Sequence, residues 1–399
     1  MARLFLLLQL SSLMAVGIAH QQALNQLPLV SNQGDEFHPT PFYSRQRDET
    51  SLDDAFKEFE RITDNPPLFT GITTFAHLDA PACFSKDLPD GSFDIAFVGS
   101  PFDTGVIYRT GARFGPAGIR MGSRRLGKYS GHSVELDYNP FNSPFTVVDC
   151  GDAPVTPMDN RVAIKQLEQA HQIITSRKPA NQTLLKHPKL ITLGGDHTIT
   201  LPALRNAYKQ WGQLSIIHFD SHLDTFNPDS LKDIYGGVNS NYSSVNHGTY
   251  FHIAKDEGLL KDDANIHAGV RLMLFDPVED IKEDRRCGFD IIKATQMETL
   301  GIKGIVERLK KRVGDGPVYI SIDIDVLDPG FAPATGTAEP GGWTSREMLS
   351  IIEGLSGINL VGADIVEVAP AYDTNAETTT MLAAELLYEI LIVMQMSPV

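Results

Sequence analysis

The sequence predicts a three-layer α/β/α domain built around a mainly parallel sheet of about eight strands. From about residue 75 onward, short apolar runs alternate with longer stretches of helical periodicity, which is the pattern of parallel strands joined by right-handed crossovers. The runs at 214–217 and 318–322 are almost continuously apolar, as expected for strands covered on both faces. An acidic cluster follows each of these two runs, and ligands of such sheets gather beyond the carboxyl ends of the strands.

The individual elements follow from the same periodicity. Eight stretches have the length and composition of strands: 94–98, 146–148, 189–193, 214–219, 265–270, 290–292, 318–322 and 359–365. Helical periodicity is clearest at 160–176, 201–211, 300–313 and 345–355. No internal repeat or low-complexity tract interrupts this alternation, so we expect one large domain at 69–399.

The N-terminal region differs from the rest of the chain. Residues 1–19 have the charge, apolar run and small residues of a secretory signal peptide with cleavage after Ala19, and residues 20–68 are predicted to be a polar N-terminal arm. The apolar run is too short for a spanning helix, so we expect a secreted or secretory-pathway protein (extracellular, cell wall or vacuole) with no membrane attachment after cleavage. The sequons at Asn181 and Asn241 then become candidate glycosylation sites.

The overall charge limits the kinds of partner that the protein can bind. The formal net charge is −16, which argues against nucleic acid or an anionic membrane surface and modestly favours cationic ligands. The sequence also lacks a basic patch that would offset this balance.

The cysteine count indicates neither a disulfide framework nor a thiolate zinc site. Cys83, Cys150 and Cys287 are an odd number with no CxxC spacing. One disulfide is possible, but buried, unreactive thiols are the favoured interpretation.

The two acidic clusters together predict a metal site. Asp220, His222 and Asp224 follow one apolar run, and Asp323 and Asp325 follow another. Residues at i, i+2 and i+4 of an extended segment project to the same side, so each set converges if its segment stays extended. Either cluster alone is as well explained by a solvated turn or a helix cap, but the presence of both favours metal binding.

The charge and the donor types indicate which metals would bind. Four buried carboxylates require neutralisation, and two divalent cations supply four positive charges. His197, after the run at 189–193 and the glycine pair at 194–195, is a further candidate ligand from a third strand. The oxygen and imidazole donors favour manganese or magnesium over structural zinc, although cobalt, nickel or iron also fits.

Several segments resemble the signature blocks of the ureohydrolase family, which includes arginases, agmatinases and guanidinobutyrases. They are GGDHT at 194–198, HFDSHLD at 218–224, SIDIDVLDPGFAPATGT at 321–337 and GADIVEVAP at 362–370. GARFGPAGIR at 111–120 and NHGTYF at 246–251 resemble the agmatinase branch more than the arginases. The similarity runs in chain order from about Pro67 to Met394, and it implies the three-layer fold predicted above.

The resemblance also implies the roles of particular residues. A centre of two Mn²⁺ per subunit is expected, and the residues that match its ligands are His197, Asp220, His222, Asp224, Asp323 and Asp325. His247 matches the histidine that shuttles a proton, and Glu367 matches the acid that holds the guanidinium group. Without the resemblance, an ordinary loop histidine and a structural acid are the favoured interpretations of these two residues.

The implied activity is hydrolysis of a small cationic guanidino compound to urea and an amine, with agmatine to putrescine ranked first and a homo-oligomer expected. The alternatives are guanidinobutyrase or arginase activity, a non-catalytic metal-binding member of the fold, and a deacetylase of related architecture. No ligand is missing from the motifs, which disfavours the last two. The stretch 225–246 is longer than in arginases and bacterial agmatinases and contains no arginine that could clamp a carboxylate, which leads us to rank arginine third.

Overall fold

The computed structural model describes residues 53, 56–57, 69–230 and 243–397. The chain divides into two units, 1–64 and 65–399, and the fold described below is that of the second unit. The signal peptide at 1–19, nearly all of the arm at 20–68 and the sequon at Asn241 lie outside the described residues. The division of the chain into these segments therefore stays a prediction.

An eight-stranded sheet lies at the centre of the domain, in the order β2-β1-β3-β8-β7-β4-β5-β6, and every pairing between neighbouring strands is parallel. The strands are β1 (Ile95–Gly99), β2 (Val147–Asp152), β3 (Lys189–Leu193), β4 (Ser215–Phe219), β5 (Asn265–Val270), β6 (Phe289–Lys293), β7 (Val318–Asp323) and β8 (Leu360–Val366). The eight predicted strands are all confirmed, with ends shifted by a few residues at most, and so is the predicted fold class.

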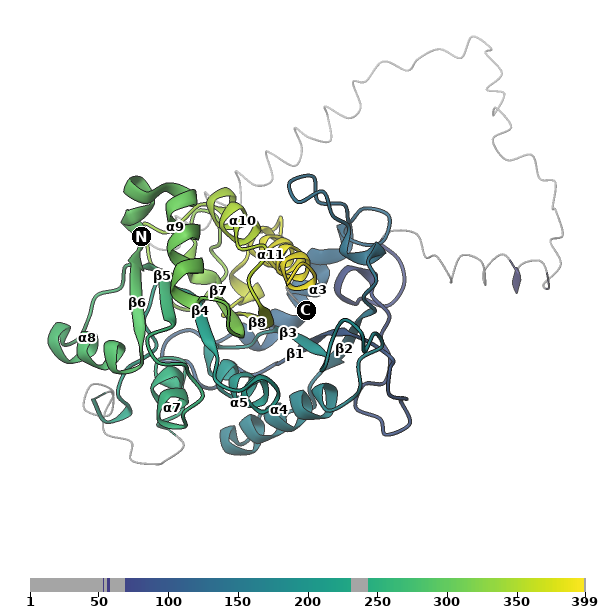
Figure 1. Cartoon of the computed structure of the whole chain (residues 1–399), viewed down its shortest axis with the longest axis horizontal. Coiled ribbons are helices and arrows are strands. Elements are labelled where there is room, and N and C mark those ends of the chain that lie inside the picture. The colour runs from purple at the N-terminus through teal and green to yellow at the C-terminus, as the bar shows by residue number, and fades with distance from the viewer. Residues whose placement is uncertain (1–52, 54–55, 58–68, 231–242, 398–399) are drawn as a thin grey trace, which may run out of the picture. The chain divides into compact units, whose positions relative to one another are not determined.

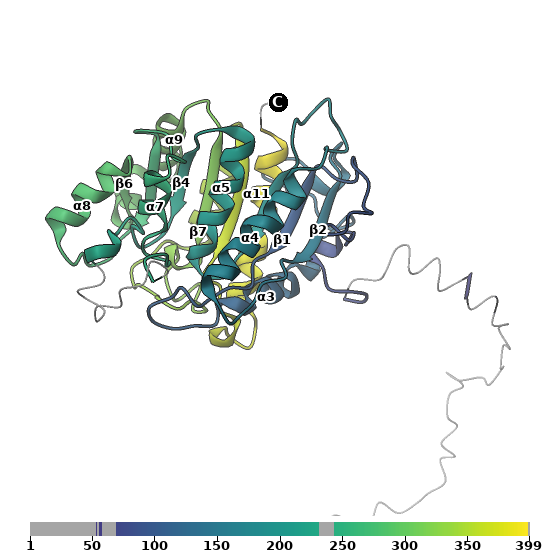
Figure 2. The ribbon, with the colours of Figure 1, turned by 90° about the horizontal axis from the view of Figure 1, so that it is seen from below.

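Helices cover both faces of the sheet, which gives the three predicted layers (Figure 1). One face carries α4 (Asn160–Thr175), α5 (Thr200–Trp211) and α7 (Tyr250–Asp256); the other carries α3 (Gly115–Gly122), α9 (Met297–Val313), α10 (Ser345–Gly354) and α11 (Thr378–Gln395). A further helix, α8 (Pro277–Arg286), precedes β6. Figure 2 shows α4 and α5 crossing in front of the strands from a second direction.

The core consists of the two apolar layers between the sheet and its helices. Strand side chains such as Ile320 and Ile365 pack on the α9, α10 and α11 side, while Ile216 and Tyr319 pack with Leu204 on the α5 side. Each of these side chains is at most 3% exposed. Both faces of the central strands are therefore buried, as their continuous apolar runs predict.

The C-terminal helix α11 was missed by the periodicity analysis. It is apolar on nearly every side, so it lacks the one-sided pattern of a surface helix. Among the described helices it is the one long and apolar enough to cross a membrane, yet it packs between α3 and α10 and most of it is buried. Its composition is thus that of a core helix.

The structure contradicts the favoured interpretation of the cysteines. Cys83 and Cys150 form a disulfide between the segment before β1 and the edge strand β2, and their Cα atoms are 5.4 Å apart. Cys287 is buried and free, as predicted. The sequence could not show the pairing because 67 positions separate the two cysteines, and only the packing of the 69–94 segment against the sheet brings them together.

Candidate metal centre

The candidate site lies at the carboxyl ends of four adjacent strands in the middle of the sheet. His197 follows β3, Glu367 follows β8, Asp323 ends β7 and Asp220 follows β4. Strands β3 and β4 are consecutive in this part of the chain, but β8 and β7 are inserted between them in the sheet. Side chains that are far apart in sequence meet here because all four strands point in the same direction.

The polar atoms of the cluster converge on one buried histidine. His197 Nδ1 lies 3.2 Å from Asp220 Oδ2, 3.1 Å from Asp224 Oδ2 and 3.3 Å from Asp323 Oδ2. Its Nε2 lies 2.8 Å from the Ser321 hydroxyl, which fixes the orientation of the ring. The histidine predicted as a ligand from a third strand is therefore brought into contact with both acidic clusters.

A second group of donors adjoins the first and shares Asp220 with it. His222 Nδ1 lies 3.1 Å from Asp220 Oδ1 and 3.0 Å from Asp325 Oδ2. Ser221 holds the other oxygen of Asp325, since its hydroxyl donates to Oδ1 at 2.8 Å. The two oxygens of Asp220 thus face two different sets of ligands, which suits a pair of cations bridged by one carboxylate.

The acidic clusters do not converge for the reason that the sequence suggested. Strand β4 ends at Phe219, so 220–224 does not stay extended, and Asp224 has a left-handed φ of 54°. Asp325 lies in a short 3-10 helix, η7 (Ile324–Val326). The expectation of continued extension is therefore wrong, although the predicted convergence holds.

Local turns orient the carboxylates instead. Asp220 Oδ1 accepts a hydrogen bond from the backbone N–H of His222 at 2.6 Å, and Asp323 Oδ1 accepts one from the N–H of Asp325 at 2.8 Å. In each case an aspartate hydrogen-bonds the backbone two residues later and so bends the chain just after the strand. The other oxygen of each carboxylate, Oδ2, lies near His197 Nδ1.

The electrostatics of the site favour the binding of positive charge. Burial, followed by repulsion from Asp325 and Asp220, raises the pKa of Asp323 well above its usual range. Burial and Asp220 likewise raise the pKa of both Asp224 and Asp325. Although burial opposes protonation of the histidines, the carboxylates raise the pKa of His197 and His222. Bound cations would remove this strain.

Several buried donor atoms of the site lack a well-formed hydrogen bond, although other polar groups lie near them. Within the described part of the chain, His197 Nδ1, Asp220 Oδ2 and Asp325 Oδ2 are buried without a hydrogen-bond partner. Buried polar atoms of this kind are costly unless they bind an ion or water. The nitrogen and oxygen donors therefore fit divalent cations, with Asp220 common to both groups.

Sequence reasoning missed His218, which belongs to the first group of donors. Its Nε2 lies 3.0 Å from Asp220 Oδ2 and 3.1 Å from the Tyr250 hydroxyl, and its Nδ1 lies 2.7 Å from Nδ1 of His267. His267 in turn contacts Asp284 at 2.9 Å. The signal that could have found His218 is alternation along β4, since His218 and Asp220 are two positions apart.

The predicted proton-shuttling residue lies next to the predicted guanidinium-binding acid. His247 Nδ1 is 3.2 Å from Glu367 Oε1, and His247 Nε2 accepts a 3.3 Å hydrogen bond from the backbone N–H of Ile107. A neutral ring therefore carries its proton on Nδ1. Although burial opposes it, the Glu367 carboxylate raises the pKa of His247. Both residues adjoin the metal ligands, because Glu367 Oε1 also accepts from the His197 N–H at 2.9 Å.

Close backbone packing holds this arrangement. A Cβ atom on Gly195 would lie 2.2 Å from the carbonyl oxygen of Phe102, and one on Gly194 would lie 2.5 Å from the carbonyl oxygen of Ile365. The glycine pair thus allows the approach of backbone that the sequence suggested. Glu367 has a left-handed φ of 61°, a strained conformation that is often found at functional sites.

A cavity of about 630 Å³ opens onto the donor groups. His222, Asp224, Asp323 and His247 lie on its inner wall. Apolar residues line much of the remainder, and the charged residues there are Arg109 and Glu339. The reasoning from the 225–246 stretch was therefore incomplete, because Arg109 reaches the cavity from a different segment.

The family model described as "Arginase family" matches residues 93–393. The chain belongs to the arginase family. It is 51% identical over 371 residues to a Schizosaccharomyces pombe protein named "Putative agmatinase 1", covering 91% of this chain and 92% of that one. The resemblance to the agmatinase-like branch is thereby confirmed.

Other relatives share the fold but carry different names. A guanidinobutyrase of Pseudomonas aeruginosa is 37% identical, with 82% of this chain and 94% of that protein covered. The structure of proclavaminate amidinohydrolase from Streptomyces clavuligerus superimposes with a TM-score of 0.70 at 34% identity, covering 83% of this chain and 99% of that one. The relatives of this chain are thus named for several different activities.

Proposed function

We propose that the protein hydrolyses the guanidinium group of agmatine to give putrescine and urea, using two Mn²⁺ ions. The observation that carries this proposal is the pair of donor groups that share Asp220, of which His222 and Asp224 line the cavity. The ligands would be those predicted: His197, Asp220, His222, Asp224, Asp323 and Asp325. Oxygen and imidazole donors without thiolate support manganese, and the names of several relatives support agmatine.

The residues divide the chemistry between them. When bound, divalent cations would lower the pKa of a water molecule and hold it near the guanidinium carbon. The water oxygen forms a bond to that carbon, the bond from carbon to the alkylated nitrogen breaks, and urea and the amine are the products. The departing nitrogen must gain the proton that the water loses.

His247 is placed to move that proton. The neutral ring has a free electron pair on Nε2 once the Ile107 hydrogen bond is released, and the charge that it gains is balanced by Glu367 at Nδ1. A histidine whose pKa is raised above its ordinary value both accepts and returns a proton near neutral pH. Besides its predicted role in holding the guanidinium, Glu367 thus stabilises the imidazolium form of His247.

Two charged residues of the cavity favour different substrate tails. Glu339 Oε1 lies 3.8 Å from His222 Nε2, and a carboxylate in this position suits the terminal ammonium of agmatine. Arg109, whose guanidinium lies 5.0 Å from the Tyr108 ring centroid, suits a substrate carboxylate. Guanidinobutyrate hydrolysis is therefore the second candidate, and the named Pseudomonas relative supports it. Arginine remains third.

The experiment is a urea-release assay with agmatine, guanidinobutyrate and arginine on manganese-loaded protein. We expect the largest kcat/KM for agmatine, a loss for Glu339→Gln with agmatine, and little change for Arg109→Gln. A tenfold preference for guanidinobutyrate, about 1.4 kcal/mol, that disappears in Arg109→Gln would replace agmatine with the second candidate. Absence of urea release from all three substrates with both metals bound would instead favour the non-catalytic alternative.

We also propose that the protein enters the secretory pathway and is a homo-oligomer. The signal-like segment at 1–19 motivates the first proposal, and the Cys83–Cys150 disulfide supports it because disulfides persist in oxidising compartments. Asn181 is a candidate glycosylation site: it is partly exposed, and the Thr183 hydroxyl donates to its side-chain oxygen at 2.6 Å. Asn241 is the second candidate.

A further inference from the structure

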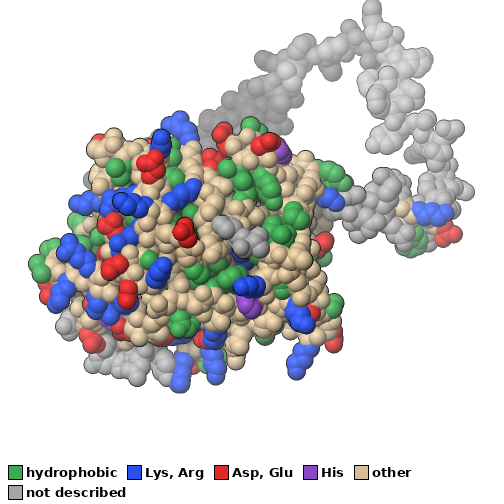
Figure 3. Space-filling view, viewed as in Figure 1, with side chains coloured by type: hydrophobic (Ala, Val, Ile, Leu, Met, Phe, Trp, Pro, Cys, Tyr) green, Lys and Arg blue, Asp and Glu red, His purple; other side chains and the backbone are tan. Residues whose placement is uncertain are grey.

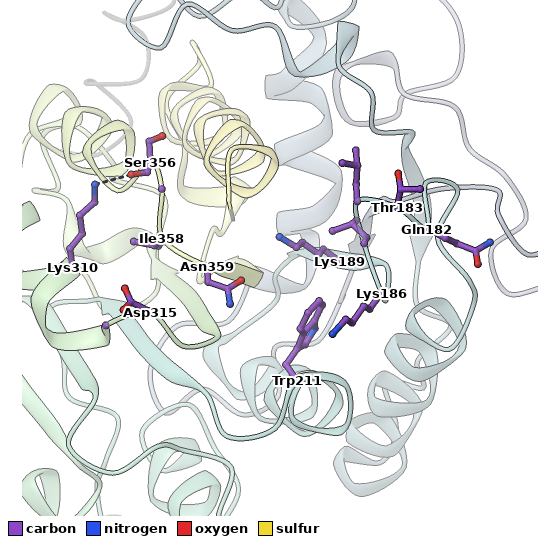
Figure 4. Close-up of a pocket in the computed structure, with 14 residues that line it drawn as sticks. Gln182, Thr183, Lys186, Lys189, Trp211, Lys310, Asp315, Ser356, Ile358 and Asn359 are labelled. Carbon is purple, nitrogen blue, oxygen red and sulfur yellow. Dashed lines mark hydrogen bonds between the residues drawn. The ribbon is translucent and has the colours of Figure 1, made fainter. Parts of the chain in front are cut away.

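A second large cavity lies at the amino ends of the strands, whereas the metal centre lies at their carboxyl ends. It has a volume of about 760 Å³ and is lined by residues at the amino ends of β3 and β8 and at the carboxyl ends of α5 and α9 (Figure 4). Lys189 begins β3 and Asn359 directly precedes β8, whereas His197 and Glu367 follow the same two strands at the other end. This cavity is therefore separate from the catalytic site.

The charge of this cavity is opposite to that of the protein. Among the described residues, its lining contains Lys186, Lys189 and Lys310 but one carboxylate, Asp315, so the formal charge of these lining residues is 3 − 1 = +2. The whole chain has 34 basic and 50 acidic residues, or −16. Figure 3 shows basic and acidic side chains mixed over one face of the molecule. A concave site with a net positive charge stands out in such an acidic protein and attracts anions.

Lys189 is a buried cation in the lining of this cavity. It is 3% exposed, and its ammonium group donates one hydrogen bond, at 3.3 Å, to the carbonyl oxygen of Met394. Within the described part of the chain no carboxylate lies at ion-pair distance from it. Burial lowers the pKa of Lys189 to about 8, so the amine is still charged at neutral pH, with no compensating carboxylate among the described residues. A buried cation of this kind is costly until an anion neutralises it.

The remaining lining residues indicate what type of anion would fit. Lys310 Nζ donates to the Ser356 carbonyl oxygen at 2.8 Å, and the lining contains no arginine that could hold a carboxylate through two parallel hydrogen bonds. Lysine ammonium groups act as point charges and are common phosphate ligands. Trp211 and Leu184 supply apolar surface, and Figure 4 shows Lys186, Lys189 and Asn359 around the same space as the Trp211 indole.

We propose that this cavity binds a small organic phosphate, with its phosphoryl group between Lys186 and Lys189 and its apolar or aromatic part against Trp211. Asn359 also lines the cavity and offers a neutral hydrogen-bonding group. The site is independent of the proposed catalytic activity, since none of its lining residues belongs to the catalytic cavity.

Tryptophan fluorescence gives a direct readout for this site. The chain contains two tryptophans, and Trp343 is buried in the core at 2% exposure, so quenching by an added ligand reports mainly on Trp211. The probe is adenosine 5′-monophosphate added to the full-length, manganese-loaded protein, with adenosine as the ligand control. We expect saturable quenching by the monophosphate and at least tenfold weaker quenching by adenosine, because the phosphoryl group supplies the charge interaction.

Charge-neutralising variants test the location of binding. Lys186→Gln, Lys189→Met and Lys310→Gln, each of which removes one positive charge from the lining, should each raise the dissociation constant by about tenfold. Lys303→Gln is the matched control for Lys310→Gln: both lie on α9 and lose the same charge, but Lys303 is exposed and lies outside the cavity. If Lys189→Met does not fold, Lys186→Gln and Lys310→Gln still test the proposal.

Two outcomes would overturn it. Equal quenching by adenosine and the monophosphate would show that no phosphate is recognised. Unchanged affinity in Lys186→Gln and Lys310→Gln, together with loss of binding when a saturating concentration of agmatine is present, would assign the phosphate to the catalytic cavity. Urea release by Lys186→Gln should equal that of the unmodified protein, so failure of this proposal is distinguishable from failure of the proposed function.

Discussion

At the scale of the residue, Asp220 is the centre of the site because its two oxygens face different donor groups. Asp220→Asn should lower the content of both metals and reduce urea release by more than about 100-fold, since even the outer partners of metal ligands contribute about 10- to 100-fold. Metal analysis and the urea assay measure the two effects. Asp262→Asn, which makes the same change at an exposed position, is the control. Full metal content with normal turnover in Asp220→Asn would contradict the assignment.

His247 should affect the rate without affecting the metal. His247→Ala removes the group proposed to transfer a proton, and general acid–base catalysis typically contributes about 10²- to 10⁴-fold. We expect both metals to be retained and kcat to fall within that range. His252→Ala, a histidine on α7 that contacts Glu283 at 2.7 Å, serves as the control. An unchanged kcat in His247→Ala would transfer the proton step to another residue.

His171 predicts a specific dependence of stability on pH. It is completely buried on α4, and neither ring nitrogen has a hydrogen-bond partner among the described residues, so burial lowers its pKa to about 4. The unfolded chain takes up a proton near pH 6.5 and the folded protein does not, so stability falls as the pH is lowered from 6.5 towards 4.

The size of this effect can be isolated by substitution. Between pH 7 and pH 4 the unfolding free energy of the unmodified protein should fall by about 3 kcal/mol more than that of His171→Leu, at about 1.36 kcal/mol per pKa unit. Urea denaturation at several pH values measures the difference. If the difference between the two proteins is constant over this range, His171 does not titrate as proposed.

At the scale of the element, each strand determines the position of a site residue, and the turn after the strand determines the orientation of its side chain. The hydrogen bonds that Asp220 and Asp323 accept from the backbone N–H two residues later replace the extended geometry that the sequence suggested. Disulfide Cys83–Cys150 acts similarly at the sheet edge, where it ties the segment before β1 to β2.

Removal of that disulfide should destabilise the domain without altering the site. Cys83→Ala/Cys150→Ala should lower the unfolding free energy by about 2–5 kcal/mol, because the cross-link closes a long loop in the unfolded chain. Urea denaturation measures the loss, and the kcat of the folded double variant should be unchanged. Cys287→Ala, which removes a buried free thiol, controls for the loss of a cysteine side chain. A double variant as stable as the unmodified protein would show that the cross-link contributes nothing.

At the scale of the whole molecule, strand order concentrates function at one edge of the sheet. The four strands that carry the site are neighbours, although the site residues are spread from residue 197 to residue 367. The proposed phosphate site lies at the amino ends of two of the same strands. A site for anions and a site for cations would therefore lie at opposite ends of these strands.

The proposed passage through the secretory pathway is also tested on the whole chain. Expression of the full-length protein in a eukaryotic cell should yield extracellular or vacuolar protein that begins at His20, because the predicted signal peptide ends at Ala19. N-terminal sequencing and mass spectrometry, before and after removal of N-linked glycans, measure the cleavage and any glycan at Asn181 or Asn241. An intact Met1 on protein confined to the cytosol would contradict the proposal.

The sequence by itself predicted the eight strands, four of the helices and the family, and the six residues that it predicts as ligands lie together in the structure. Strands were predictable because burial on both faces produces continuous apolar runs. Helix α11 was not predictable, because a helix buried on all sides has no periodic pattern of apolar residues. Tertiary structure alone decided three things: the Cys83–Cys150 pairing, the reach of Arg109 into the cavity and the cation-lined hollow around Lys189. Each depends on contacts between segments distant in the chain, and local patterns do not encode such contacts.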